Sequence, residues 1–562
     1  MQGIFKTVLW VAMMTMMSLG VWAGSMTIYT ESGDEIWCED LDHAMSALEL
    51  KDESIQLGNG PVTIRLDEDL ALSKTFDFSW IDRDITLDLN GNTLKSQENA
   101  DWFNDELLNI ELTDGHSDGH SFTLQDGTVT GAKTKGAIRI AAGQRVTIKN
   151  VTFENNHCDG NLSDLREGDV GGAIRCNSNL KIVGCTFRNN SCTTHGGAVG
   201  IYSNDYQSRF VIENCTFENN TAVEAGGALF LGCSGRIQNT TITGNTVTGR
   251  EDGATQGQNE TTSGQGGGVY LTRHGGVSYG DVGEGFWWGR FEGPTLQIEE
   301  GVTITGNAAS LRPGAAARTN NLYLARHWES YNNAAVMVSG DTRAETRVGL
   351  TLSDGSGVFT RTLNEEGGEW LTDDYSTWFF SDAGARMRTL YDGEEGLMKL
   401  SFNAPAGEAV ECKAGSAEEA KAQCTFVPAE DVAQNLKADD KAKYEAMFTP
   451  VATQTGDNTW SVTYELTEAA TNVLQESVNT AQTAVLGAMT DPSAQSATVP
   501  ARPGFYYAIE YGSDLNLGAN TKGQMATGIS VELDKPTDMP ATRGFFRVKV
   551  SPSKIDSTPL NQ

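Results

Sequence analysis

The chain has 562 residues, of which 74 are acidic and 41 are basic, and its formal net charge is −33. Proteins that bind nucleic acid neutralise phosphates with Lys and Arg, so this charge excludes nucleic acid as a partner. The apolar share of 39% is low for a globular enzyme. Together with 62 glycines it fits a long β-structure with a narrow core, and the length leaves room for a further domain.

Residues 1–23 have the features of a signal peptide. Lys6 precedes an uncharged run over residues 7–22, and Val21 and Ala23 occupy the small-residue positions of a cleavage site. The run is shorter than the roughly 20 apolar residues that a membrane span needs. Because no later segment of the sequence is long and apolar enough to cross a bilayer, we expect an exported protein, secreted or at the cell surface. We expect no transmembrane segment after cleavage.

Residues 24–60 predict an N-terminal cap. Residues 26–30 have the pattern of a strand, and residues 40–50 have apolar positions at helical spacing, with Asp40 and Asp42 near the start where the helix dipole favours acids. A helix placed here would cover the unpaired strand edges at the open end of a repeat structure.

The next region repeats itself. The segment Val-Thr-Ile-Lys-Asn-Val-Thr-Phe-Glu-Asn-Asn at residues 146–156 returns in related form at 180–190, 210–220, 236–245 and 298–307. Its apolar residues alternate with polar ones, which is the period of a half-buried strand. A second motif stands between the copies, Gly-Gly-Ala-Ile or a close variant, at residues 171–174, 196–199, 226–229 and 266–269.

A unit of about 20 to 35 residues cannot close a core by itself, so neighbouring units must stack, which predicts a solenoid. We therefore predict an all-β fold, a parallel β-helix over residues 61–404, in which each coil lies about 4.8 Å from the next. Equivalent residues then form columns. We expect an interior aromatic column of Phe153, Phe187 and Phe217, a corner column of Asn156, Asn190 and Asn220, and interior stacked thiols at Cys185 and Cys215.

The alternation of Gly-Gly-Ala-Ile and Phe-x-x-Asn segments resembles the repeats of chlamydial polymorphic outer-membrane proteins and of related secreted, adhesin-like β-helix proteins of other bacteria. The resemblance covers roughly residues 85–325 and is specific because the motifs recur. It implies a right-handed parallel β-helix that is exposed at a surface or secreted, with a role in attachment. We see no C-terminal run of alternating membrane strands, so we do not expect self-anchoring.

Residues 405–562 predict a smaller C-terminal mixed α+β domain of unknown role. Apolar residues recur at helical spacing over residues 467–489, and strands are expected at 505–509 and 545–550. The number of cysteines, nine, is odd, so at least one is unpaired within the chain. Among these cysteines, Cys412 and Cys424 flank a short segment and are the better candidates for a disulfide.

An excursion between Asn245 and Leu296 breaks the repeat and supplies the candidate ligand-binding residues. Exposed Trp rings stack on sugar rings, and aromatic residues clustered around an Arg are typical of binding hot spots. The competing interpretation is that these rings fold back over the solenoid. The residues are Phe286, Trp287, Trp288, Arg290 and Phe291.

Some β-helix proteins cleave polysaccharides, which requires acids and bases on one outer face. Outward candidates here are Arg139, Arg175, Asp169 and His195, but they stand in different contexts and form no recurring pair, so solvated surface charge is the favoured interpretation. The cysteines lack the paired spacing of a zinc site, and we expect no cofactor, no metal ion and no catalytic residue.

Three functions therefore remain open. The first is an adhesin or ligand-binding protein that recognises a glycan or the surface of a host or neighbouring cell, without catalysis. The second is a carbohydrate-active β-helix enzyme, a polysaccharide lyase or hydrolase. The third is a structural spacer that displays the C-terminal domain. The sequence identifies neither the ligand nor the anchoring nor the oligomeric state.

Overall fold

The computed structural model describes most of the chain after residue 24. The residues described are 25–48, 57, 60–79, 81–97, 105–112, 119–160, 170–201, 209–250, 264–272, 294–325, 334–353, 355–360, 373–428, 430–490, 494–512, 519–527, 530–536, 545–552 and 555. The predicted signal peptide lies outside them.

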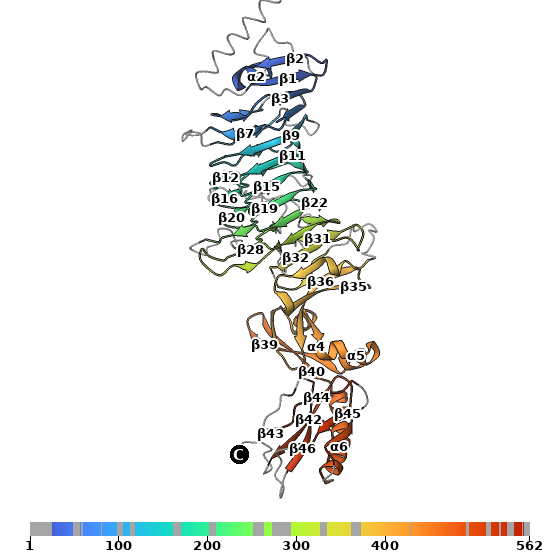
Figure 1. Ribbon diagram of the computed structural model, residues 1–562. Coiled ribbons are helices and arrows are strands. Elements are labelled where there is room, and N and C mark those ends of the chain that lie inside the picture. The colour runs from blue at the N-terminus through green and yellow to red at the C-terminus, as the bar shows by residue number, and fades with distance from the viewer. Residues whose placement is uncertain are drawn as a thin grey trace, which may run out of the picture. The chain divides into compact units, whose positions relative to one another are not determined.

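The chain divides into two compact units. The first comprises residues 1–354, 358–384 and 389–399, and the second comprises residues 355–357, 385–388 and 400–562. The first unit is a stack of short parallel strands, coloured blue to yellow in Figure 1, and is the predicted parallel β-helix. The domain limits drawn from the sequence stay predictions.

The coils stack into three long faces and one short sheet. Face 1 consists of β5 (Phe76–Asp77), β8 (Leu108–Ile110), β10 (Ile138–Ile140), β13 (Ile174–Cys176), β17 (Val199–Ile201), β21 (Leu229–Leu231), β25 (Val269–Leu271) and β30 (Leu322–Leu324). Face 2 consists of β3 (Val62–Leu66), β6 (Ile85–Asp88), the first halves of β9 (Ser121–Thr130) and β11 (Arg145–Glu154), β14 (Asn179–Val183), β18 (Phe210–Glu213), β22 (Gly235–Gln238), β26 (Thr295–Ile298) and β31 (Ala335–Val338).

The remaining strands complete each coil. Face 3 consists of β4 (Leu70–Leu72), β7 (Thr93–Ser96), the second halves of β9 and β11, β15 (Thr186–Arg188), β19 (Thr216–Glu218), β23 (Thr241–Thr243) and β27 (Thr303–Thr305). The short sheet, here called the corner sheet, consists of β12 (His157–Cys158), β16 (Ser191–Cys192), β20 (Thr221–Ala222), β24 (Thr246–Val247), β28 (Ala308–Ala309) and the antiparallel β29 (Arg318–Thr319). The last coil is closed by β32 (Arg347–Leu352) and β34 (Phe379–Ser381).

The predicted asparagine column is a continuous ladder of buried amides. Asn220 is fully buried, and its Nδ2 donates to the carbonyl of Phe187 at 3.0 Å and to Oδ1 of Asn245 at 2.9 Å. Its own Oδ1 accepts from the backbone N–H and from Nδ2 of Asn190, each at 3.0 Å. The ladder extends over Asn156, Asn190, Asn220, Asn245, Asn307 and Asn321 and ends on the carboxylate of Asp382.

The residue before each ladder amide explains why the motif carries a doublet. Asn189 and Asn219 have φ of 55° and 56°, a left-handed conformation that Asn tolerates better than most residues with a Cβ. In the weaker repeats Gly244 and Gly306 take the same place with φ of 67° and 68°. The first residue of the doublet therefore turns the chain and the second connects the coils.

The predicted aromatic column is also confirmed. The rings of Phe153 and Phe187 stack at 4.8 Å, and those of Phe187 and Phe217 stack at 4.6 Å, with interplanar angles of 5° and 2°. Ile242 and Ile304 continue this column in register, as expected. All five side chains are fully buried, so this column belongs to the core of the solenoid.

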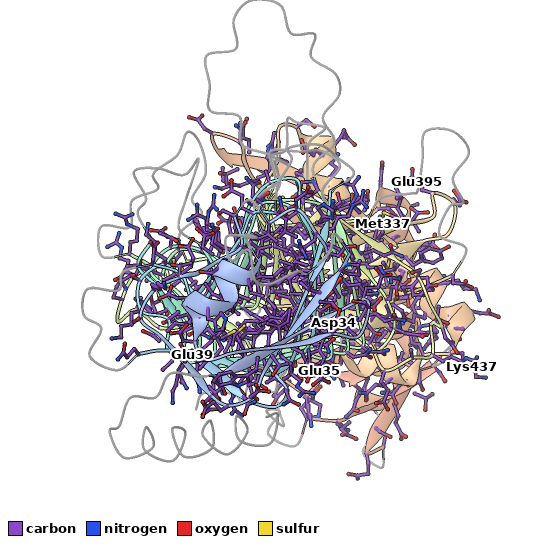
Figure 2. The ribbon with its side chains drawn as sticks, turned by 90° about the horizontal axis from the view of Figure 1, so that it is seen from above. Asp34, Glu35, Glu39, Met337, Glu395 and Lys437 are labelled. Atoms are coloured by element: carbon purple, nitrogen blue, oxygen red, sulfur yellow. The ribbon has the colours of Figure 1, made fainter. Side chains whose placement is uncertain are left out.

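The N-terminal cap is built by β1 (Met26–Thr30), β2 (Glu35–Cys38) and α2 (Leu41–Leu48). β1 pairs antiparallel with both β2 and β3, and α2 buries Leu41, Ala44, Ala47 and Leu48. Seen from above, Asp34, Glu35 and Glu39 lie at this end of the stack (Figure 2), and all three are exposed. Acidic side chains along an edge strand oppose its pairing with another chain.

The second unit contains both helices and sheets. Strands β37 (Val410–Lys413), β39 (Phe448–Gly456) and β40 (Thr459–Leu466) form one antiparallel sheet. The predicted helix is α6 (Glu468–Thr490), and the predicted strands are β42 (Tyr506–Gly512) and β46 (Phe545–Ser551), which pair with each other. Shorter elements are α3 (Ala417–Ala422), β38 (Cys424–Val427), α4 (Glu430–Asn435), α5 (Ala438–Glu445), β41 (Ser496–Pro500) and β45 (Ser530–Asp534).

All nine cysteines lie within the described residues, and all are buried and outside any disulfide. Cys185 and Cys215 stack inside the solenoid, as predicted. Cys412 and Cys424, the better candidates for a disulfide, form none in this structure, and Sγ of Cys412 donates to the carbonyl of Ala420 at 3.9 Å instead. They pack among Ala404, Ala420 and Val462, so they behave as small apolar side chains.

Asn220→Ala should destabilise the solenoid by about 3 kcal/mol or more, because it leaves several buried donors and acceptors without partners. The matched control is Thr216→Ala. Thr216 lies on β19, the strand just before Asn220 in the same coil, but its side chain points outward. We expect a large loss of melting temperature and of hydrogen-exchange protection for the first variant and little change for the second. Equal losses would contradict the role of the ladder.

Asp382 predicts a pH dependence of stability. Burial raises the pKa of this carboxyl, although Asn321 and Thr351 donate hydrogen bonds to it. A carboxyl with a raised folded-state pKa contributes most to stability at low pH, and the contribution is lost as pH rises through that pKa. The melting temperature of the wild type should therefore fall relative to that of Asp382→Asn as the pH rises above about 4, the ordinary value of an aspartate. A difference that stays constant above this pH would show that Asp382 does not titrate there.

Candidate functional site

Face 1 carries an outward row of side chains, one from each coil, in which charged and amide groups give way to aromatic rings. We call it the face 1 row. The strand register aligns Asp77, Asn109, Arg139, Arg175, Gly200, Phe230, Tyr270, Tyr323 and Thr351.

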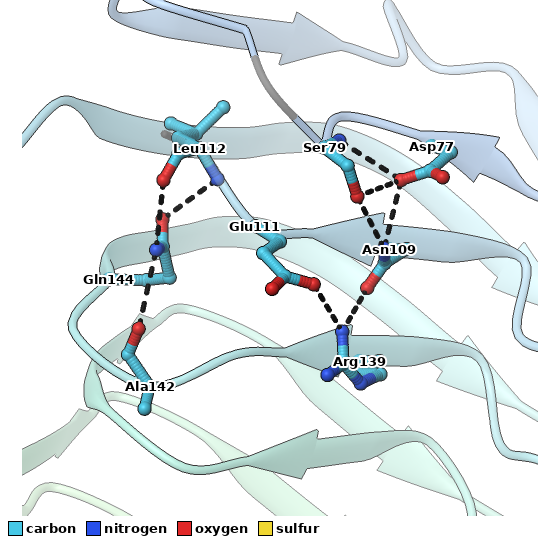
Figure 3. Close-up of polar contacts among 8 residues, drawn as sticks. All are labelled: Asp77, Ser79, Asn109, Glu111, Leu112, Arg139, Ala142 and Gln144. Carbon is cyan, nitrogen blue, oxygen red and sulfur yellow. Dashed lines mark hydrogen bonds and ion pairs between the residues drawn. The ribbon is translucent and has the colours of Figure 1, made fainter. Parts of the chain in front are cut away.

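Arg139 is the centre of the polar half. Its Nη1 donates to Oδ1 of Asn109 at 2.7 Å and to Oε2 of Glu111 at 2.9 Å (Figure 3). The side chains of Arg139 and Glu111 are 33% and 49% exposed, so the pair remains open to a ligand. Since an ion pair this exposed contributes about 0 to 1 kcal/mol, stability alone does not explain it.

Asn109 connects this pair to the previous coil. Its Nδ2 donates to Oδ1 of Asp77 at 2.8 Å and to Oγ of Ser79 at 3.0 Å. The same oxygen of Asp77 accepts from the backbone N–H and the hydroxyl of Ser79 (Figure 3). Both ends of the Asn109 amide are therefore engaged, and Arg139 is held in one orientation over a rigid sheet.

Two neighbouring carboxyl groups, those of Asp105 and Glu106, also interact with the site of Arg139. Burial raises the pKa of Glu106, the hydrogen bond and charge of Asp105 raise it further, and the positive charge of Arg139 opposes the shift. When protonated, a carboxyl can donate as well as accept hydrogen bonds. The adjoining turn is fixed by Gln144, whose Oε1 and Nε2 bond to the backbone N–H and carbonyl of Leu112, both at 3.1 Å (Figure 3).

Gly200 separates the two halves of the row. A Cβ at this position would lie 2.5 Å from Cγ2 of Val170, so only glycine leaves room for the Val170 side chain here. Beyond it the row is aromatic. Phe230 stacks on Tyr270 at 5.4 Å, and Tyr270 stacks on Tyr323 at 5.3 Å.

The aromatic half is buried, although its side chains point away from the solenoid core. Phe230, Tyr270 and Tyr323 are only 2–6% exposed. The ring of His195 stacks on that of Phe230 at 4.5 Å, and burial lowers the pKa of His195 to about 4. The stacked, buried rings of the aromatic half therefore stabilise face 1. The groups of the face 1 row that are open to a ligand are those around Arg139.

The structure brings together some of the sequence candidates. Arg139 and Arg175, which the sequence placed in unrelated contexts, are register neighbours on one face, so that expectation was wrong. His195 was expected to be outward and solvated but is buried. Asp169 and the aromatic cluster from Phe286 to Phe291 lie outside the described residues.

Sequence reasoning missed the partners of Arg139. Asn109 and Glu111 lie on the coil directly before that of Arg139 and belong to no motif. Because the coils differ in length, the sequence does not show which residue of that coil aligns with Arg139. The only signal was the alternation around Leu108 and Ile110, which marks Asn109 as outward. Within the described residues, no three His, Cys, Asp or Glu side chains are grouped to hold a metal ion.

The model of the right-handed beta helix region matches residues 109–279 of this chain. The matched segment begins at Asn109 and covers much of face 1, and it establishes the hand of the solenoid. The fold is therefore a right-handed parallel β-helix with an N-terminal cap and a smaller mixed domain. Neither a curated protein nor a solved structure matches the chain. Among the described residues, no helix has the length and apolar character of a membrane span.

His195 predicts an acid-dependent loss of stability. Its pKa of about 4 in the folded chain lies below the ordinary value of about 6.5, so the unfolded chain binds more protons between these limits. Stability should fall as pH drops through this window. His195→Phe keeps the stack on Phe230 and removes the titration, so its advantage over the wild type in urea unfolding should be larger at about pH 5 than at about pH 7. An equal advantage at both pH values would contradict burial of a neutral imidazole.

Proposed function

We propose that this protein is an exported β-helix protein that binds a glycan on a host or neighbouring cell through the outer surface of its solenoid, and thus acts as an adhesin. The observation that carries the proposal is the hydrogen-bonded network around Arg139 on face 1. The ion pair of Arg139 with Glu111 is partly exposed, the members of the network come from three successive coils, and an ion pair this exposed contributes little to stability.

The chemistry of this network suits a hydroxylated ligand. Guanidinium, amide and carboxylate groups stand side by side, so the network can donate to and accept from neighbouring hydroxyls of a sugar ring. The parallel coils place such groups at a spacing of about 4.8 Å along the face, which favours an extended polymer over a compact ligand. The net charge of −33 favours a neutral glycan over a polyanion.

The sequence supports the same function. The features of a signal peptide in residues 1–23 support export, and the repeats resemble those of chlamydial polymorphic outer-membrane proteins and secreted adhesin-like proteins. The aromatic cluster around Trp287 and Trp288 would add stacking surfaces for sugar rings.

A carbohydrate-active enzyme is the second candidate, and one observation favours it. Glu106 has a raised pKa beside Asp105 and Arg139, and cleavage of a glycosidic bond needs a carboxyl that keeps its proton near neutral pH together with an ionised one. The two functions share one site and differ in whether the bound polymer is cut.

Arg139→Met should weaken binding at least about tenfold, because it removes the guanidinium and keeps the length of the side chain. Binding would be measured on a glycan array and then by calorimetry with the best ligand. The matched control is Arg188→Met on face 3, which removes a similar surface ion pair with Glu154. Trp287→Ala with Trp288→Ala tests the aromatic cluster separately.

Each outcome decides between the functions. Equal binding by wild type and Arg139→Met would remove face 1 as the binding site. No binding by the wild type to any glycan would leave the spacer function ahead. Release of new reducing ends or unsaturated products from the bound glycan, abolished by Glu106→Gln, would establish the enzyme.

A further inference from the structure

The corner sheet presents an outward row that the binding function does not use. Its inward side chains, such as Cys158 and Cys192, are buried in the solenoid. The outward positions in register are His157, Ser191, Thr221, Thr246 and Ala308.

His157 lies between a hydroxyl and a carboxylate. Its Nδ1 is 2.7 Å from Oγ of Ser191, and its Nε2 is 2.9 Å from Oδ1 of Asp159. An ionised carboxylate only accepts hydrogen bonds, so Nε2 carries the ring proton in the neutral imidazole. Nδ1 is then the acceptor, and Ser191 donates its hydroxyl proton to it. A serine that donates to a histidine oriented by an aspartate is the arrangement of an activated nucleophile.

The backbone holds these residues in place from the adjacent coils. The N–H groups of His157 and Asp159 donate to the carbonyls of Ala132 and Thr134 at 2.8 Å and 2.6 Å, and the N–H of Ser191 donates to the carbonyl of Asn156 at 2.9 Å. His157 and Asp159 are two residues apart along extended chain, and side chains alternate between the two faces of a strand. Both side chains therefore point outward. The contact therefore rests on strand register rather than on loop conformation.

The next coil offers a natural comparison. Thr221 is in register with Ser191, but its hydroxyl lies 3.1 Å from that of Thr246, with no imidazole between them. Both Ser191 and Thr221 are half-buried outward groups. They differ in the proton acceptor beside them, so a difference in reactivity would report on His157.

We propose that Ser191, His157 and Asp159 form an acyl-transfer site that cleaves esters of small carboxylic acids, an activity beyond the binding function and independent of face 1. Oγ of Ser191 bonds to the ester carbonyl carbon while its proton passes to Nδ1 of His157. The ester C–O bond then breaks, and the alcohol leaves with that proton. Water, deprotonated by the same nitrogen, attacks the acyl-serine, releases the carboxylic acid and restores Ser191.

The openness of the site sets the expected reactivity. The side chains of His157 and Asp159 are 37% and 59% exposed, so small reagents reach Ser191, but water weakens the electrostatic stabilisation of the transition state. Covalent labelling is therefore a sharper test than turnover.

The experiment treats the full-length chain with an alkyl fluorophosphonate and follows the adduct by intact mass and peptide mapping. We expect a single adduct on Ser191 that is absent from Ser191→Ala. His157→Gln should be labelled at least about tenfold more slowly, and Asp159→Asn should also be slower. Thr221→Ala should be labelled like the wild type.

The proposal is overturned by an unlabelled wild type, by an adduct on another residue, or by equal labelling of wild type and His157→Gln. Any of these results would make the contact an ordinary polar contact on the surface of the sheet. The first two results need no variant, so a folding defect in a variant cannot leave the question open. Because the glycan assay reads face 1 and this assay reads the corner sheet, either proposal can fail without the other.

Discussion

The asparagine ladder is the interaction on which the rest of the structure depends. A corner of chain that leaves the sheet would bury backbone groups without partners, at a cost of about 1 to 3 kcal/mol for each. The amide of each ladder residue prevents this, since its oxygen serves two donors of one neighbouring coil and its nitrogen serves an acceptor of the other. The amide also fixes the register, because a coil displaced by one residue would point the amide outward. At Asp382 a carboxylate closes the ladder with acceptors alone.

A fixed register has a consequence for the surface. Side chains about one coil apart in the chain become direct neighbours, and the interior columns leave the outward positions free to vary. On face 3 those positions hold a row of threonines, which suits the β-branched preference of exposed strands. On face 1 they hold the network around Arg139, and on the corner sheet they hold Ser191 beside His157. The same scaffold thus supports two separate groups of polar residues, each held by neighbouring coils.

The two units of the chain are stabilised differently. The solenoid stacks equivalent residues, so its aromatic rings are nearly parallel, as in Phe153, Phe187 and Phe217. The second unit packs unlike elements, and its rings meet at widely different angles, from 12° between Phe448 and Phe505 to 65° between Tyr444 and Phe505. Its buried cluster joins α6 to β39, β41, β42 and β45, strands of different sheets, which is the ordinary core of a mixed domain.

The sequence by itself determined the solenoid, its aromatic and asparagine columns and its buried thiols, because each repeat carries these features within a few consecutive residues. Helix α6 was also predictable from local sequence, because its apolar residues recur at helical spacing. The pairing of Arg139 with Asn109, the contact of Ser191 with His157 and the burial of His195 were decided only by the tertiary structure. Coils differ in length, as the interval from Asn245 to Asn307 shows, so the sequence does not state which outward residues align. Alignment is set by hydrogen bonds between coils, and those bonds exist only once the chain has stacked.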